Sequence, residues 1–244
     1  MQMQTRTAEP LSRPAAHGRV ASGIPAPAIP SPAAPVHEAL AVLEQFGTRQ
    51  AVRRGHEFYA AGDAARFCYR IVSGSVRTVG LDEDGRRQIA EFLLPGDLLG
   101  FDSLDTHHLS AEALTDTVVL RYPRGVIDTL AEQHGALALR LRSLTMQNLR
   151  RAHEKMFLLC RKSASERIAS FLLEMAARAP GKAGGAVDLP MSRADIADHL
   201  GLTIETVSRN IAQLCRDGTI AAARCGIEIR NRGALEAFGT DTRH

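Results

Sequence analysis

Residues 191–216 carry the pattern that most constrains the fold of this 244-residue chain. Small Ala197 allows two helices to approach closely, and Gly201 supplies a tight turn four residues later. Apolar residues recur at helical spacing in the second helix and predict one buried face, made of Ile204, Val207, Ile211 and Leu214. The opposite face carries Glu205, Ser208, Arg209 and Ala212. Because the polar residues of this face, Glu205, Ser208 and Arg209, lie near the helix N-terminus, the pattern predicts a helix-turn-helix whose second helix meets DNA base edges in the major groove.

Capping and turn signals flank both helices. Ser192 followed by Asp195 predicts a capping pair for the first helix, and Thr203 is placed to cap the second. Two strand-like pieces, 219–221 and 227–229, then predict a small hairpin, or wing. The alternative is a helical hairpin that only packs, but such a pair has no use for three polar residues on one outward stripe.

Composition excludes several classes of protein. No apolar run approaches the roughly 18 residues of a membrane span, and the N-terminus has no apolar signal-peptide core. The four cysteines are scattered without CxxC spacing, so we expect a cytoplasmic protein with no metal site and no cofactor. We find neither a nucleophile–base–orienter set nor a phosphate-binding loop, and therefore expect no enzymatic activity. Because no apolar run is long enough to span a membrane, we also expect no membrane association.

The net charge of +3 is unevenly distributed. Residues 121–182 hold 12 Lys and Arg against 5 Asp and Glu, whereas residues 183–244 hold 7 against 8. DNA-binding domains usually carry a basic footprint, so the nearly neutral C-terminal part stands in tension with DNA binding. We therefore expect basic residues just upstream, Lys162 among them, to add phosphate contacts.

The chain upstream divides into three parts. Residues 1–36 contain 7 of the 11 prolines and no periodicity, which predicts a disordered tail. Within residues 37–124, short strand-like runs alternate with turn signals and no helix intervenes, which predicts an antiparallel β-barrel or jelly roll. Residues 125–161 predict a long helix, and residues 162–244 hold the winged helix-turn-helix. The predicted fold class is α+β.

The long helix has two neighbouring apolar stripes at near-heptad spacing. A helix with this much apolar surface needs the barrel on one side and a partner on the other, so we expect a homodimer. The alternative is a helix packed only on its own barrel. The expected interface residues are Leu137, Leu141, Leu144, Met146, Leu149 and Met156.

A jelly roll, a long helix and a winged helix-turn-helix in this order resemble the CRP/FNR family of bacterial transcription regulators, over roughly residues 37–235. The resemblance is carried by motifs within residues 74–89, 92–114 and 189–209. It is best to the FixK/FNR branch, because the second helix reads Glu-x-x-Ser-Arg from position 205. The resemblance implies an activator in low-oxygen gene control that binds a TTGA-N6-TCAA-like palindrome as a homodimer and contacts RNA polymerase.

The resemblance also implies a role for individual residues. Glu205 is expected to accept a hydrogen bond from cytosine N4, Arg209 to bind guanine O6 and N7, and Ser208 to donate to a base or a phosphate. Contacts to the DNA backbone are expected from Lys162, Arg193, Thr203, Thr206 and Arg224.

Differences between this sequence and the family's sensor motifs indicate which signals the protein can sense. The segment 99–112 lacks the arginine with which cyclic-nucleotide-binding members pair the phosphate, and Asp102 and Asp105 would repel one. Residues 1–67 contain no cysteine, and Leu120 stands at the inner cysteine position of the iron–sulfur members. The resemblance therefore implies a FixK-type regulator with neither sensor. The alternative is a ligand-responsive regulator whose barrel binds a small molecule or haem.

Three further features have both a functional and a structural interpretation. His107-His108 could ligate a metal, but we expect a surface loop. Cys215 and Cys225 could register oxidation near the DNA, but we expect ordinary half-buried cysteines. Residues 83–85 could touch RNA polymerase, and a solvated hairpin tip explains them equally well.

Overall fold

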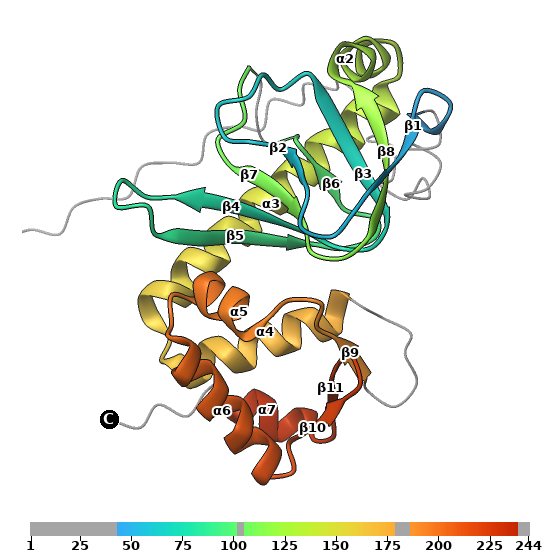
Figure 1. The fold of residues 1–244 in the computed structure, drawn as a ribbon. Coiled ribbons are helices and arrows are strands. Elements are labelled where there is room, and N and C mark those ends of the chain that lie inside the picture. The colour runs from blue at the N-terminus through green and yellow to red at the C-terminus, as the bar shows by residue number, and fades with distance from the viewer. Residues whose placement is uncertain (1–42, 102–104, 179–185, 239–244) are drawn as a thin grey trace, which may run out of the picture. The chain divides into compact units, whose positions relative to one another are not determined.

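A computed structural model describes residues 43–101, 105–178 and 186–238 (Figure 1). The predicted tail, residues 1–36, and Asp102 lie outside the described residues. In the described ranges no helix combines the length and the apolar character that crossing a membrane requires.

The N-terminal part is built from two four-stranded antiparallel sheets. One sheet has the order β1 (Thr48–Val52), β8 (Thr117–Pro123), β3 (Phe67–Ser73), β6 (Leu98–Leu99). The other has the order β2 (Glu57–Tyr59), β7 (Ser110–Ala113), β4 (Val76–Leu81), β5 (Arg87–Leu93). Side chains from both sheets share one apolar core, which includes Tyr59, Ile71, Val76 and Val119. The predicted antiparallel jelly roll is confirmed.

Gly74 makes the sharp turn between β3 and β4. Its φ of +85° lies in the left-handed region, and a Cβ there would come within 2.5 Å of the Asp116 carbonyl oxygen. Only glycine avoids both the strain and the clash, so this position fixes how the two sheets are joined.

The predicted helical stretch 125–161 is two helices, which corrects the expectation of one. Helix α2 (Arg124–Gln133) ends at His134, whose extended backbone (φ −122°, ψ 91°) separates it from α3 (Gly135–Arg161). Leu137 of α3 is 1% exposed and packs with Ile127 and Leu130 of α2 in a core beside the barrel. Leu137 is therefore wrong as a dimer-interface residue, because it is already covered within its own chain.

The C-terminal part is a winged helix-turn-helix, as predicted. Helices α4 (Ala164–Arg178), α5 (Arg193–Leu200), α6 (Ile204–Arg216) and α7 (Arg232–Phe238) accompany a three-stranded sheet of order β10 (Ile220–Ala223), β11 (Gly226–Ile229), β9 (Ala186–Asp188). Strand β9 extends the predicted hairpin by one strand. The fully buried side chains here, each worth about 1.5–3 kcal/mol of burial, include Ile168, Phe171, Leu172, Val207 and Leu214.

The second barrel sheet and the C-terminal helices share an apolar core. Val79, Ile89 and Phe92 of β4 and β5 belong to the same buried cluster as residues of α4, α5 and α6. The Phe92 and Phe171 rings lie edge to face with centroids 6.0 Å apart. Helix α5 therefore lies against β5 (Figure 1).

Candidate nucleic-acid interface

The turn between α5 and α6 is built as the sequence predicts. Ser192 and Asp195 form a reciprocal capping box at the start of α5, and Gly201 ends the helix in the left-handed conformation with φ 62°. Thr203 then caps α6, because its hydroxyl accepts a hydrogen bond from the Thr206 backbone N–H at 3.2 Å. All three predicted signals are confirmed, and together they fix the angle at which α6 leaves α5.

Helix α6 buries a narrower face than predicted. Val207, Ile211 and Leu214 are buried, but Ile204 is 48% exposed. The prediction that Ile204 is buried is wrong, because it is the first residue of the helix and lies at the edge of the apolar face. An apolar side chain therefore stands on the surface at the N-terminus of α6.

The predicted reading face is exposed. Glu205, Ser208, Arg209 and Ala212 all lie on the solvent side of α6. Hydrogen bonds from its own backbone N–H and from the Thr203 hydroxyl hold the pKa of Glu205 below its usual value. Glu205 is therefore an ionised acceptor at neutral pH, beside the positive end of the helix dipole.

The residues predicted to contact the DNA backbone differ in their exposure and in their hydrogen bonds within the protein. Thr203 and Thr206 share a hydroxyl–hydroxyl hydrogen bond of 3.1 Å at the start of α6, and Arg224 is exposed between the two wing strands. Lys162 donates to the Ser170 hydroxyl at 2.7 Å, and Arg193 is half-buried. Of the three basic residues, Arg224 is therefore the most exposed. The phosphate contacts of all five residues remain predictions.

A row of apolar side chains on α3 lies uncovered. It consists of Leu139, Met146, Leu149, Met156 and Phe157, which are 51, 55, 48, 50 and 62% exposed. We call this row the α3 apolar face. Leu139 and Met146 are one heptad apart, as are Leu149 and Met156, which is the spacing of a coiled-coil seam. Leu141 and Leu144 are half-buried, and Leu141 packs on the core that contains Leu137.

Sequence reasoning missed Phe157 and left Leu139 out of the expected interface. The heptad spacing that starts at Leu139 could have shown which of the two apolar stripes on α3 is the exposed one. An uncovered apolar row of this kind marks an interaction surface.

A lysine and a histidine meet where α3, α5 and β5 come together. Lys155 Nζ donates to the carbonyl oxygens of Ile89 at 2.9 Å and Ala90 at 2.7 Å, and to His199 Nδ1 at 2.9 Å. Burial lowers the pKa of Lys155 to about 8. Burial, and then the charge of Lys155, lower the pKa of His199 to about 3. At neutral pH, His199 is therefore an uncharged acceptor for a charged lysine.

This pair predicts acid sensitivity of the fold. His199 binds a proton near pH 6.5 when unfolded but only near pH 3 when folded, so stability falls as the pH drops through this window. Between pH 7 and pH 5 the loss should be up to about 2 kcal/mol, at about 1.4 kcal/mol per pKa unit. Urea unfolding at both pH values should show a smaller loss in His199→Gln, whose amide oxygen still accepts from Lys155. Equal losses in both proteins would contradict the prediction.

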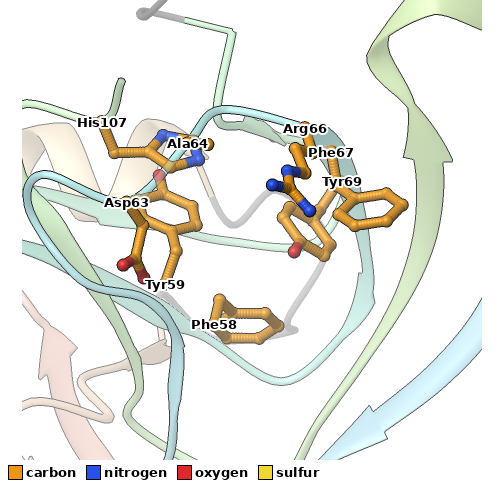
Figure 2. A pocket seen from close by; sticks show the side chains of 8 residues that line it. All are labelled: Phe58, Tyr59, Asp63, Ala64, Arg66, Phe67, Tyr69 and His107. Carbon is orange, nitrogen blue, oxygen red and sulfur yellow. The ribbon is translucent and has the colours of Figure 1, made fainter. Parts of the chain in front are cut away.

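A pocket of about 320 Å³ opens in the barrel, lined by Phe58, Tyr59, Asp63, Ala64, Arg66, Phe67, Tyr69 and His107 (Figure 2). The His107 ring stacks on the Tyr59 ring with centroids 3.5 Å apart. His107 is 4% exposed, so the surface-loop prediction is wrong for His107, although His108 is exposed. The aromatic stack holds His107 inside the fold.

The structure also places the cysteines and the candidate metal-binding side chains. Within the described residues no group of three or more His, Cys, Asp or Glu side chains could hold a metal ion. Cys215 is half-buried as expected, but Cys225 is exposed, because it lies at the tip of the wing. Cys68 is buried and donates to the Gly100 carbonyl oxygen at 3.3 Å.

Comparison with known proteins agrees with this architecture. Residues 166–238 match the Crp-like helix-turn-helix domain, and residues 49–134 match the cyclic nucleotide-binding domain. The nitrogen fixation regulation protein FixK of Bradyrhizobium diazoefficiens is 38% identical over 201 residues, which cover 82% of this chain and 85% of the relative. FixK of Azorhizobium caulinodans is 41% identical over 199 residues, which cover 80% of each chain.

A solved structure adds a match in three dimensions. The structure of FixK2 from Bradyrhizobium japonicum superposes with a TM-score of 0.75 at 42% identity, and the match covers 79% of this chain and 96% of that one. The barrel, the long helix and the capped helix-turn-helix thus occur together in relatives that match most of the chain. The chain belongs to the CRP/FNR family of transcription regulators, with a helix-turn-helix DNA-binding domain and FixK proteins among its relatives.

Proposed function

We propose that this protein is a FixK-type activator that binds a TTGA-N6-TCAA-like palindrome as a homodimer and controls genes used at low oxygen. The observation that carries the proposal is the exposed row of Glu205, Ser208 and Arg209 at the capped N-terminus of α6. The identity to FixK proteins supports the low-oxygen role.

The chemistry of the row fits the proposed half-site. Ionised Glu205 accepts from cytosine N4, and the Arg209 guanidinium matches the two acceptors of guanine in the major groove. Exposed Ile204 adds an apolar side chain that suits a thymine methyl group. One half-site of TTGA offers both a G·C pair and thymine methyls, so these residue types and these bases complement one another.

The spacing of the palindrome fits a dimer. Two four-base half-sites separated by six bases have centres about 10 base pairs apart, which is one turn of B-DNA and the separation that helix-turn-helix dimers use. The α3 apolar face supports the proposed dimer, since a second copy of α3 would cover its heptad positions. Activation implies contact with RNA polymerase, for which the exposed β4–β5 hairpin tip, residues 82–86, is a candidate surface.

Selection from random DNA tests the proposal. Purified protein incubated with a library of random duplexes should enrich two-fold symmetric sites with TTGA and TCAA six bases apart. Genome-wide mapping of bound sites in the source organism should then return the same motif. Enrichment of an asymmetric motif, or no enrichment, would contradict the proposed function.

The barrel pocket favours a second candidate, a regulator whose DNA binding responds to a small molecule. We expect cyclic nucleotides to be excluded, because segment 99–112 has no arginine to pair with the cyclic phosphate. Calorimetry with millimolar cyclic AMP or cyclic GMP should give no saturable heat. Micromolar binding with a matching rise in DNA affinity would instead support the ligand-responsive regulator.

A further inference from the structure

We propose that Arg77 and Arg87 of the barrel position the reading helix by binding Asp195 and Asp198 of α5, so that a built-in ionic contact orients the DNA-binding domain. This inference rests on the proposed function, since the reading helix is the one assigned there to base contacts. We call these four residues the barrel–helix clamp.

Asp195 is the centre of the clamp because its two carboxylate oxygens accept hydrogen bonds from different partners. Oδ2 accepts from the Ser192 backbone N–H at 2.9 Å and from the Ser192 hydroxyl at 2.8 Å, which completes the cap of α5. Oδ1 accepts from Arg77 Nη1 at 2.6 Å and from Arg87 Nη2 at 2.8 Å. One carboxylate thus joins the start of α5 to two barrel strands.

Both arginines are held in place by a second carboxylate. Arg77 donates through Nε at 2.8 Å and Nη2 at 2.5 Å to Glu112 on the neighbouring strand β7. Arg87 donates through Nε to Asp198 at 2.9 Å, one turn along α5 from Asp195. Because each guanidinium makes several bonds in a fixed plane, the arginines constrain direction as well as distance.

Burial makes the contact strong. The Asp195 side chain is 6% exposed and that of Arg77 is 19% exposed. Burial alone would raise the pKa of Asp195, but the Ser192 hydrogen bonds and the two arginine charges hold it below its usual value. Removing either arginine would take away one of the two cations that pair with the buried Asp195 carboxylate, which costs more than the loss of an exposed ion pair.

The clamp reaches α6 through a short, rigid connection. Ala197 of α5 and Val207 of α6 are 1% and 0% exposed in one core, and the Leu202 backbone N–H donates to the Ala197 carbonyl oxygen at 3.0 Å. Only residues 201–203 separate the two helices. A rotation of α5 on the barrel therefore carries the reading face of α6 with it.

Other polar contacts also join the barrel to the C-terminal helices. Arg178 at the end of α4 donates to Asp97 of the barrel at 2.5 Å, and Lys155 ties α3 to both β5 and α5. The first contact holds α4, and the second reaches α5 only at His199 in its last turn. The clamp differs from them because it binds the first turn of α5 itself.

Three variants separate loss of the clamp from simple loss of charge. Arg87→Ala removes the clamp arginine, whereas Arg86→Ala removes the adjacent arginine, which is 75% exposed and pairs only within its own hairpin with Asp82 and Asp84. Arg87→Lys keeps a positive charge beside Asp195 and Asp198 but loses the planar guanidinium that bonds both carboxylates. Sedimentation of each full-length variant serves as the control that its oligomeric state is that of the wild type.

The first measurement needs no DNA. Amide hydrogen exchange of α5 and α6 should become faster in Arg87→Ala, stay at the wild-type rate in Arg86→Ala, and lie between these two rates in Arg87→Lys. The second measurement is affinity for the palindrome and for scrambled DNA at fixed salt. Arg87→Ala should lower palindrome affinity about tenfold or more beyond any loss seen in Arg86→Ala, and Arg87→Lys should recover part of it.

The two readouts separate failure of the clamp from failure of the proposed function. Equal exchange rates in Arg87→Ala and Arg86→Ala, or faster exchange with no selective loss of palindrome affinity, would overturn the clamp. A wild-type protein that binds palindrome and scrambled DNA equally would overturn the proposed function. In that case faster exchange confined to Arg87→Ala still supports the tether, and unchanged exchange refutes it.

Discussion

Replacing Leu149 and Met156 with Glu is expected to leave the protein monomeric and to abolish tight operator binding. Both side chains lie on the α3 apolar face and are 48% and 50% exposed, so the substitutions should leave the protomer fold intact. In a dimer, each new carboxylate would lie against its symmetry mate in an apolar seam, which is strongly unfavourable. Loss of the second half-site should weaken operator binding by roughly 10²–10⁴-fold.

Sedimentation velocity and operator titration measure the two effects. Leu81→Glu is the matched control, because Leu81 is a leucine with 72% exposure at the end of β4, far along the chain from the seam. Leu141→Glu would be a poor test, since Leu141 packs on the core beside the barrel. A Leu149→Glu, Met156→Glu protein that stays dimeric would move the interface away from α3.

Replacing Arg209 with Ala is expected to cost about 1–3 kcal/mol for each half-site and to relax the preference for guanine. Glu205→Ala should loosen selection at the same G·C pair while leaving affinity for non-specific DNA unreduced, because removal of an acid takes away no attraction for phosphate. The control is Arg224→Ala on the exposed wing, with Lys162→Ala beside it. Loss of a phosphate contact should weaken all sequences alike and flatten the salt dependence.

The measurement is a binding series over single-base variants of TTGA-N6-TCAA at fixed ionic strength. Arg209→Ala should lose affinity selectively, so that variants lacking the guanine bind it about as well as the parent site does. A uniform loss across all variants would assign Arg209 to a phosphate, and the proposed reading of bases would be wrong.

Local signals in the sequence predicted local structure well. The capping box of Ser192 and Asp195, the Thr203 cap and the left-handed Gly201 each depend on residues within one helical turn. The strand and turn pattern likewise predicted the antiparallel barrel, because antiparallel pairing follows from short connections. These features need no knowledge of distant parts of the chain.

Features that depend on distant neighbours were predicted less well. Helical periodicity identified two apolar stripes on α3, but only the packed structure places Leu137 in a core with α2. Periodicity also grouped Ile204 with Val207, although Ile204 at the first position of α6 is 48% exposed whereas Val207 is buried. His107 became a buried residue through stacking on Tyr59, which is 48 positions earlier in the chain.

The ion pairs of the clamp likewise could not be predicted from the sequence. Arg77 and Asp195 are 118 residues apart in the sequence, and nothing near either residue indicates the other. Asp195 alone was explained by its capping role. Its second role arises only because β4 and β5 pack against α5 in the shared core.

Titration of a labelled TTGA-N6-TCAA duplex, followed by fluorescence anisotropy near 0.15 M salt, tests sequence-specific dimeric binding most directly. The comparison duplexes are a scrambled site of equal composition and a TTGA-N5-TCAA site, whose half-sites are turned by about a tenth of a helical turn. We predict that the parent site binds at least about 10³-fold tighter than the scrambled site, with two chains per duplex, and that the shorter spacer loses most of this advantage. Equal affinity for all three duplexes would contradict the account.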